Sequence, residues 1–354
     1  EETLDIQHNP GEDHGNLVNP RMGVDTLTSS LSGSDDINDD GSSSSGTMTT
    51  TTTMTRSGTE KMTLKCISFN CHGLQTNSDY VASLASCADI LCLTETWLRP
   101  GELPGINALL ESRFPTTDFE IFAKSSMEDV SGSHPGRPFG GLAIILKKNP
   151  ALSISLIECS DRMIACLLKD SNGNDVQVVV NVYMPFYNSS RENSELYVET
   201  LDVLQSLFDK YNALCPIKCF GDFNVQLPRK ELISDIWYRQ QGFSRHSRLM
   251  YDFIVANDLT VADFQVKQSV EYTFFCHQRN IFTWIDHVLV NAYDYSSVVK
   301  CQIIVPDPDN NSDHLPIECS FTVTALVQSE PHHHDVRQPR VRQPRVPFPR
   351  AHWD

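Results

Sequence analysis

Polar side chains stand at several points of the chain where short apolar segments end, and Gly221-Asp222-Phe223-Asn224 is the clearest case. Asp222 and Asn224 are two residues apart, so in an extended chain both point to one side while Phe223 points into the core. Open α/β sheets place their chemistry at strand ends with convergent polar groups. Gly, Asp and Asn are also the commonest turn residues, so these residues alone favour a turn.

The same pattern recurs elsewhere, and each case has an ordinary structural explanation as well. Asn70 and Asn224 could close turns, Glu95 could cap a helix, and Tyr183 could be an interior aromatic with a bonded hydroxyl. Asp286 is different, because it lies within an apolar run and an unpaired buried charge is costly. A histidine is its least costly partner, and His314, in Asp313-His314, is the candidate.

The elements that would position these groups are mostly strands. Strand patterns cover 64–70, 88–95, 119–123, 142–146, 152–157, 163–169, 176–183, 216–221, 281–290, 298–304 and 317–323. Helical spacing covers 77–87, 188–212 and 245–258, with a second segment earlier in 229–258, whereas 99–139 reads as irregular apart from its short strand. Many strands and few helices predict an α/β (α+β) fold in which two sheets pack face to face with helices outside.

Composition divides the chain into three parts. Residues 1–62 carry eleven acidic and three basic side chains and are rich in Ser and Thr, which predicts a disordered acidic segment. Residues 328–354 form a flexible Pro/Arg-rich tail with two copies of Val-Arg-Gln-Pro-Arg. The ends contribute −8 and +2, so residues 63–327 keep −11 of the net charge of −17. This acidity argues against binding nucleic acid mainly by counterion release, but it allows acids that bind metal.

The eleven cysteines predict buried free thiols in a reducing compartment, nuclear or cytoplasmic. Cys215 and Cys219 have no spaced Cys/His partner pair, which argues against a zinc site. No signal peptide opens the chain and no apolar run reaches the length of a transmembrane segment, so no membrane partner is expected.

Six short motifs together resemble the endonuclease/exonuclease/phosphatase superfamily over about residues 62–323. In chain order they are Ser68-Phe69-Asn70, Thr94-Glu95-Thr96-Trp97, Val182-Tyr183-Met184-Pro185, Gly221-Asp222-Phe223-Asn224, Ile285-Asp286-His287-Val288-Leu289 and Ser312-Asp313-His314-Leu315-Pro316. Within it, the chain most resembles the apurinic-type endonuclease domain of non-LTR (LINE-type) retrotransposons. Tyr272-Thr273-Phe274-Phe275 ahead of Phe282-Thr283-Trp284-Ile285-Asp286-His287 carries that finer resemblance.

The resemblance implies a four-layered sandwich and Mg²⁺-dependent hydrolysis of a phosphodiester, with Mn²⁺ as the alternative ion. It assigns Glu95, Asn70 and Asp313 to the metal, and Asp222 to the activation of water. Asn70, Asn224 and Thr273 would contact the phosphate, Tyr183 would support it, and His314 held by Asp286 would donate to a phosphoryl oxygen. His72 departs from the pattern, because DNA-repair relatives carry a second acidic metal ligand there.

The favoured activity is a DNA endonuclease whose nick leaves a 3′-hydroxyl, with DNA as substrate and a reverse transcriptase domain as a partner absent from this chain. Another phosphohydrolase of the superfamily, an RNA deadenylase or an inositol-phosphate or sphingomyelin phosphatase, is the alternative. A third hypothesis is a catalytically silent retroelement remnant that acts only as a binding module.

Overall fold

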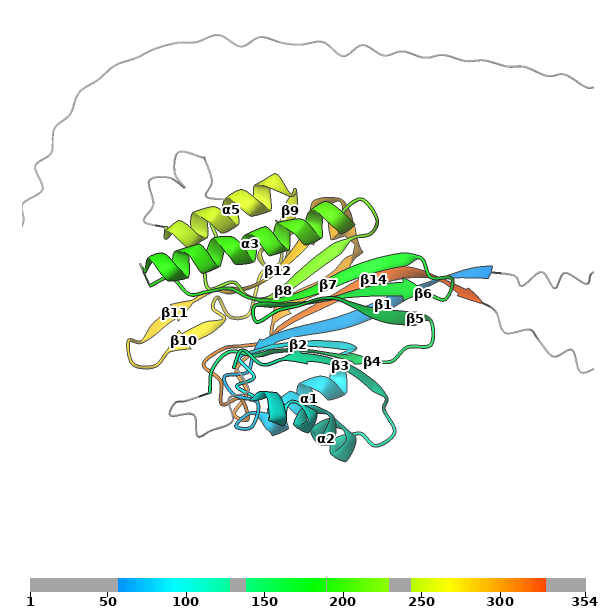
Figure 1. Ribbon diagram of the computed structural model, residues 1–354, viewed down its shortest axis with the longest axis horizontal. Helices are drawn as coiled ribbons and strands as arrows, with labels where there is room; N and C mark the ends of the chain where they lie inside the picture. The colour runs from blue at the N-terminus through cyan, green and yellow to red at the C-terminus, as the bar shows by residue number, and fades with distance from the viewer. Residues whose placement is uncertain (1–56, 128–137, 189, 229–242, 329–354) are drawn as a thin grey trace, which may run out of the picture. The chain divides into compact units, whose positions relative to one another are not determined.

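A pair of parallel strands joined by a helix forms the centre of each of two sheets in the computed structural model (Figure 1). Residues 57–127, 138–188, 190–228 and 243–328 are described. The acidic segment up to residue 56, the tip of the 125–139 loop, the helix expected early in 229–258 and the Pro/Arg tail from 329 lie outside them.

The first sheet has the order β13-β14-β1-β2-β4-β3. Its strands are β1 (Ser57–Asn70), β2 (Ile90–Thr94), β3 (Phe119–Lys124), β4 (Leu142–Lys147), β13 (Val298–Ile303) and β14 (Ile317–Gln328). β1 and β2 are parallel, and α1 (Ser78–Cys87) makes the crossover between them. The other pairs are antiparallel, so the sheet is mixed.

The second sheet has the order β5-β6-β7-β8-β12-β9 and repeats this plan. Its strands are β5 (Leu152–Cys159), β6 (Met163–Asp170), β7 (Asp175–Tyr183), β8 (Ile217–Asp222), β9 (Leu259–Val261) and β12 (Asp286–Asn291). β7 and β8 are parallel and are joined by α3 (Arg191–Tyr211). β8 approaches β7 so closely at Gly221, which has φ 144°, that an added Cβ would lie 1.9 Å from the carbonyl oxygen of Val182.

Three apolar clusters separate the four layers predicted from the sequence. One lies between the two sheets and includes Ile144, Val179 and Phe321. A second lies between the second sheet and the helices α3 and α5 (Arg245–Ala256), and a third lies between the first sheet and α1 and α2 (Pro104–Arg113). Both long helices begin with a serine cap, because Ser190 accepts from the backbone N–H of Asn193 and Ser244 from that of Ser247.

Three sequence expectations need correction. The single strand expected over 281–290 is two strands, β11 (Ile281–Thr283) and β12, because the chain leaves the small β10–β11 sheet (β10, Phe274–Cys276) at Trp284 and enters the large one at Asp286. The region 99–139, expected to be irregular, contains α2, whose start is favoured by Pro104 at its first position. β1 begins at Ser57, ahead of the strand expected from residue 64.

The remaining short elements connect these layers. They are the 3₁₀ turns η1 (Pro100–Glu102), η3 (Ala262–Phe264) and η4 (Ala292–Ser297). All eleven cysteines are free thiols, as expected, although Cys87 and Cys159 are exposed rather than buried. In the described ranges, no helix has both the length and the apolar character needed to cross a membrane.

Candidate active site

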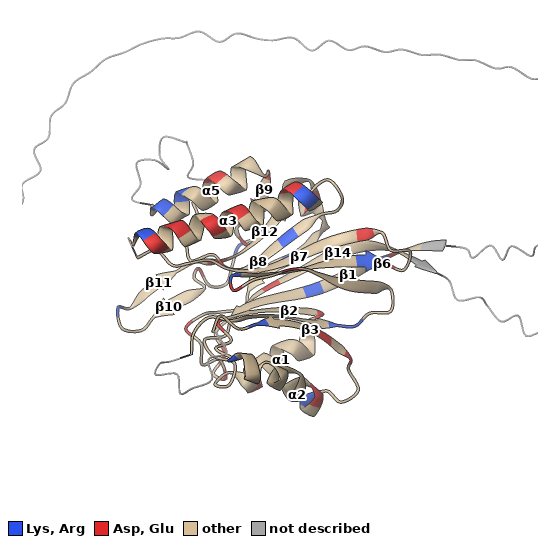
Figure 2. Cartoon of the chain, viewed as in Figure 1, with Lys and Arg blue, Asp and Glu red and all other residues tan. Residues whose placement is uncertain are grey.

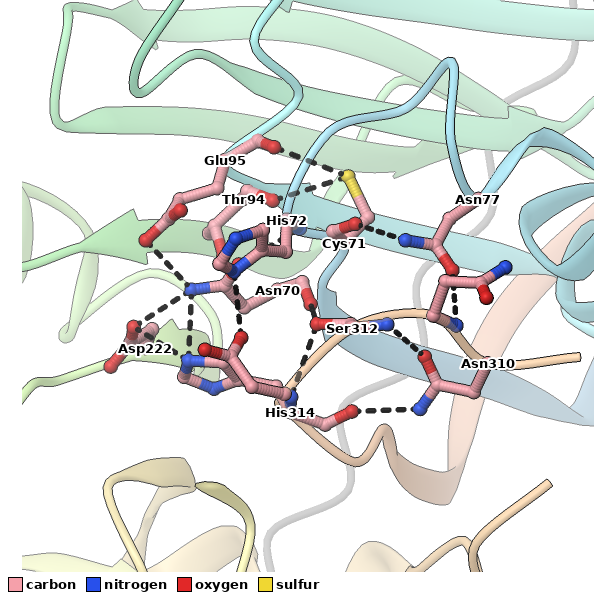
Figure 3. A network of polar contacts seen from close by, with 12 residues as sticks. Asn70, Cys71, His72, Asn77, Thr94, Glu95, Asp222, Asn310, Ser312 and His314 are labelled. Atoms are coloured by element: carbon pink, nitrogen blue, oxygen red, sulfur yellow. Dashed lines mark hydrogen bonds and ion pairs between the residues drawn. The ribbon is translucent and has the colours of Figure 1, made fainter. Parts of the chain in front are cut away.

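The polar strand-end residues Asn70, Glu95 and Asp222 converge with His314 in one network of polar contacts (Figure 3). Asn70 ends β1, Glu95 directly follows β2, Tyr183 ends β7 and Asp222 ends β8. Parallel neighbours place their carboxyl ends at the same edge, so each central strand pair delivers two polar residues there. The site is therefore assembled from both sheets.

The amide of Asn70 joins these groups. Its Nδ2 donates to Oε1 of Glu95 at 3.1 Å and to Oδ2 of Asp222 at 3.0 Å, and it lies 3.3 Å from Nε2 of His314. Asn70 is 1% exposed, so water competes little for these contacts. The expected convergence of Asn70, Glu95, Asp222 and His314 is present.

His314 and Asp286 form the expected pair. Nδ1 of His314 lies 2.8 Å from Oδ2 of Asp286, and both side chains are buried. Burial lowers the pKa of His314, but Asp286, and beyond it Asp222 and Asp313, outweigh this and raise the pKa to about 10. His314 is therefore an imidazolium near neutral pH and can donate a hydrogen bond to an anion.

The surroundings of Asp222 favour the protonated form of its carboxyl. Burial and the nearby charge of Asp286 raise the pKa of its carboxyl to about 8, while the His314 cation opposes the rise. A carboxylate with a pKa near the working pH is well suited to accept a proton. Oδ1 of Asp222 also accepts from the backbone N–H of Asn224 at 2.9 Å, so the strand end is a turn as well. Phe223 is fully buried in the core, as the alternation predicted.

Asn224 and Tyr183 lie beside this acid. Asn224 has φ 52° and its Nδ2 donates to the carbonyl oxygen of Met184 at 2.8 Å. The hydroxyl of Tyr183 donates to Oε1 of Glu95 at 2.8 Å, which bridges the two sheets. Burial, followed by the charge of Glu95, raises the pKa of Tyr183, so it stays a neutral donor. The guanidinium of Arg162 lies 5.1 Å from the centre of the Tyr183 ring.

A second histidine–carboxylate pair adjoins the first. Nδ1 of His72 lies 2.7 Å from Oδ1 of Asp313, so the neighbours Asp313 and His314 belong to two different pairs. Burial tends to raise the pKa of Asp313, but the His72 hydrogen bond and the His314 charge lower it overall. Ser312 fixes the loop, because its hydroxyl donates to the carbonyl oxygen of Asn70 at 2.7 Å and accepts from the N–H of His314. The sequence did not predict the His72–Asp313 pair or the Ser312 hydrogen bonds. Its only indication was that Ser312, Asp313 and His314 are adjacent.

Thr273 was expected at the phosphate, but its side chain is fully buried. Its hydroxyl accepts from the backbone N–H groups of Ile285 at 3.1 Å and Asp286 at 3.0 Å. It thus holds the point where the chain passes from β11 to β12.

Asp263, which sequence reasoning missed, holds the same segment from the other side. Its carboxylate accepts from Nε1 of Trp284 and from the N–H of Val288, and lies 2.9 Å from Nδ1 of His287. The only signal for Asp263 was an acid at the end of an apolar run.

Two groups of ligand atoms could bind a metal ion. Oxygens of Asp222 and Asp286 and a nitrogen of His314 lie within 4.8 Å of one another. A protonated imidazole has no lone pair to offer, so this group suits proton transfer better. Glu95, which accepts from Asn70, and Asp313, which pairs with His72, are both partly exposed, and within the described residues Oε2 of Glu95 receives no hydrogen bond. Carboxylate oxygens are the ligands that hard divalent cations prefer, so each of these two side chains has the chemistry to bind such an ion.

Comparison with known proteins agrees with this architecture. A sequence profile of the endonuclease/exonuclease/phosphatase family matches residues 67–314. No curated protein sequence matches the chain. Among solved structures, an AP endonuclease from Archaeoglobus fulgidus is 20% identical with a TM-score of 0.53, and 73% of this chain and 99% of that chain are covered.

Two further structures are similar to the same extent. An AP endonuclease from Leishmania major is 19% identical with a TM-score of 0.53, covering 73% of this chain and 87% of that chain. A 3′ phosphatase from Neisseria, bound to a product DNA hairpin, is 19% identical with a TM-score of 0.52 and coverages of 73% and 99%. At these identities the likeness establishes the fold.

Proposed function

The chain belongs to the endonuclease/exonuclease/phosphatase family, and from the site described above we propose that it is a divalent-metal-dependent endonuclease that nicks one strand of DNA. The observation that carries the proposal is the Asn70 amide, which connects a candidate metal ligand, Glu95, to a candidate base, Asp222, and a candidate cationic donor, His314. Metal-dependent hydrolysis of a phosphodiester can use these three components around one phosphorus atom.

Each residue has a role that its contacts allow. Asp222 accepts the proton of the attacking water, and its Oδ1 and Oδ2 are already oriented by Asn224 and Asn70. His314 donates to a phosphoryl oxygen, because Asp286 keeps it protonated. Asn224 uses one amide hydrogen on Met184 and retains the other for the phosphate.

Glu95, Asp313 and Asn70 are the residues that would hold Mg²⁺ or Mn²⁺. The ion would supply positive charge to the oxygens of the transition state. Tyr183 orients Glu95 through its hydroxyl, and His72 orients Asp313. Besides its place at the metal, Asn70 positions Glu95, Asp222 and His314 through its amide nitrogen. The buried Thr273 acts on the phosphate only through the segment that carries Asp286.

DNA as the substrate is supported by the surroundings of the site. The β10–β11 hairpin is adjacent, because the ring of Phe274 lies 4.9 Å from that of His314. Phe275 and Phe282 stack on this hairpin with ring centres 4.4 Å apart, and Phe282 is 51% exposed. An exposed aromatic ring beside a phosphodiester site offers a surface for a nucleobase.

The same hairpin motif supports the finer assignment to a retrotransposon-type endonuclease. Tyr272 to Phe275 and Phe282 to His287 carry the resemblance, and they form the hairpin and the start of β12. The nick would then supply a 3′-hydroxyl to a reverse transcriptase domain acting on nuclear DNA.

A plasmid assay tests the proposal. Supercoiled plasmid with Mg²⁺ or Mn²⁺ should be converted to nicked circles by the wild type and by Asp202→Asn, a control on the exposed face of α3. Asp222→Asn makes the same change of side chain as the control, but at the candidate base. This variant and an EDTA-treated sample of the wild type should leave the plasmid intact. Poly(A) RNA and inositol phosphates are the competing substrates, and turnover of either without nicking would replace the DNA endonuclease by that phosphohydrolase. Inertness toward all three would favour a binding module.

A further inference from the structure

Asn181 connects the two sheets directly beneath the site. It lies on β7 two residues before Tyr183, so both side chains point into the space between the sheets. Its Nδ2 donates across that space to the backbone carbonyl oxygens of Leu93 at 2.8 Å and Ala143 at 3.1 Å. Leu93 belongs to β2 and Ala143 to β4, so one side chain of the second sheet holds two strands of the first.

The other half of this amide has no partner in the described residues. Oδ1 of Asn181 and Oγ1 of Thr94 are both buried without a hydrogen bond from any described residue. Thr94 is 1% exposed and pairs with Leu142, whose side chain belongs to the core between the sheets, so Thr94 faces the same space as Asn181. Thr94 directly precedes Glu95, and Figure 3 shows the two side by side.

These polar atoms stand in a core that is otherwise apolar around them. Val179, Ile144 and Cys166 occupy neighbouring positions between the sheets. A buried polar atom left without a hydrogen bond costs about 1–3 kcal/mol, so the acceptor of Asn181 offsets much of what its two donated hydrogen bonds contribute to the fold. A polar residue of small net benefit to stability next to an active site indicates a role in the site.

We propose that Asn181 is a positioning residue that fixes the two sheets in the register that brings Glu95 to Tyr183, and that a buried water molecule bridges Oδ1 of Asn181 to Oγ1 of Thr94. The Tyr183–Glu95 hydrogen bond and the Asn181 contacts cross the same space two residues apart along β7. The pair of asparagine contacts therefore limits sliding of one sheet over the other at the level just below the site. Water satisfies buried polar groups that have room and at least two partners.

The inference rests on the proposed function for its kinetic part. Misplacement of a catalytic group by about 1 Å can cost on the order of 100-fold in rate. Asn181→Leu keeps the number and branching of the side-chain heavy atoms and removes the donor together with the acceptor. We expect kcat to fall by roughly 10- to 100-fold with little change in KM, since no substrate contact is removed. The melting temperature should change little, because the loss of two hydrogen bonds is offset by the removal of a buried acceptor.

Gln177→Leu is the matched control. Gln177 is a buried amide on the same strand, but it binds Pro216 and Lys218 at the end away from the site. It should lower the melting temperature and leave kcat unchanged. A purely structural Asn181 predicts the reverse order of stabilities, with Asn181→Leu destabilised and its kcat equal to that of the wild type.

Thr94→Val tests the water, because it removes only the hydroxyl. A crystal structure of the wild type should show one ordered water between Thr94 and Asn181, and the Thr94→Val structure should lack it. If the electron density of the wild type shows no water at that position, the proposed water bridge is wrong. An inactive wild type overturns the proposed function instead, whereas an active wild type with an equally active Asn181→Leu overturns the positioning role alone.

Discussion

Replacing Asp286 by asparagine removes one negative charge from beside His314 and keeps the side-chain shape. Asp286 is 3% exposed, and its Oδ2 lies 2.8 Å from Nδ1 of the imidazole. The other charges that face His314 are those of Asp222 on β8 and Asp313 on its own loop. Asn70 on β1 and the ring of Phe274 on β10 are neutral. Asp286 is the main reason that this buried imidazole is charged.

The size of the effect follows from the pKa of His314. Its rise from 6.5 to about 10 corresponds to about 5 kcal/mol in favour of the imidazolium. If the variant returns the pKa to 6.5, roughly 3% of His314 is protonated at pH 8, and a rate that needs the imidazolium falls roughly thirtyfold. Asp286 also raises the pKa of Asp222, so its removal lets Asp222 ionise at lower pH.

The pH profile of nicking at saturating substrate and metal measures both changes. The wild type should gain rate as pH rises toward about 8, where Asp222 ionises, and lose rate as pH passes about 10, where His314 is neutralised. A cation at Glu95 moves the first limb to lower pH. In Asp286→Asn both limbs should move to lower pH. If the falling limb of the variant coincides with that of the wild type, His314 is not the group that Asp286 keeps charged.

The same pair contributes to stability with a definite sign. The folded-state pKa of His314 is raised, so its stabilisation is complete below about pH 6.5 and is lost as pH rises through about 10. Urea unfolding should therefore show a larger difference between wild type and Asp286→Asn at about pH 6 than at about pH 10. A difference that grows with pH would contradict this account.

Three further outcomes are expected. Mn²⁺ should raise the melting temperature of the wild type and have a smaller effect on Glu95→Gln, because an ion that binds only the folded state stabilises it; equal shifts would place the ion elsewhere. Gly221→Ala should lower the unfolding free energy by at least about 2 kcal/mol, because φ is 144° and the new Cβ would meet the carbonyl of Val182. Thermal unfolding followed by circular dichroism measures this loss of stability. Asp294→Ala should cost about 3–5 kcal/mol, since it strands the buried Lys218 that it pairs with, and adding Lys218→Met should recover most of that loss in denaturant titrations.

The convergence of the site was predictable because it depends on strand ends. Tyr183 and Asp222 follow apolar runs of strand length, and those runs are β7 and β8. Two parallel neighbours must place such residues at the same edge, so local pattern was enough to bring them together. The pairing of Asp286 with His314 was predictable from the cost of a buried charge. The roles of these residues in a reaction stay predictions.

Contacts between distant segments could not be predicted in this way. His72 and Asp313 are separated by 241 positions, and nothing in the local sequence around either residue predicts that they pair. The break between β11 and β12 likewise has no local cause, because 281–290 is uniformly suited to a strand. It depends on Thr273 and Asp263, which bind backbone and side-chain groups on either side of Asp286. α2 was missed because it opens with Pro104 and Gly105 and buries only Ile106 and Leu110, which leaves no clear apolar stripe at helical spacing.

The distribution of charge limits how a polyanion can reach this site. Exposed acids recur along α3 on the outer layer of the second sheet, at Glu192, Glu195, Glu199 and Asp202 (Figure 2). Phosphates are repelled from that face, and an acidic surface gains little from counterion release. A DNA substrate of the proposed kind would instead be expected at the end of the sandwich, where burial is outweighed by Asp286 in raising the pKa of His314 and Phe282 is exposed on the adjacent hairpin. On the proposed function, the substrate would therefore be bound at the same strand ends that would carry out the chemistry.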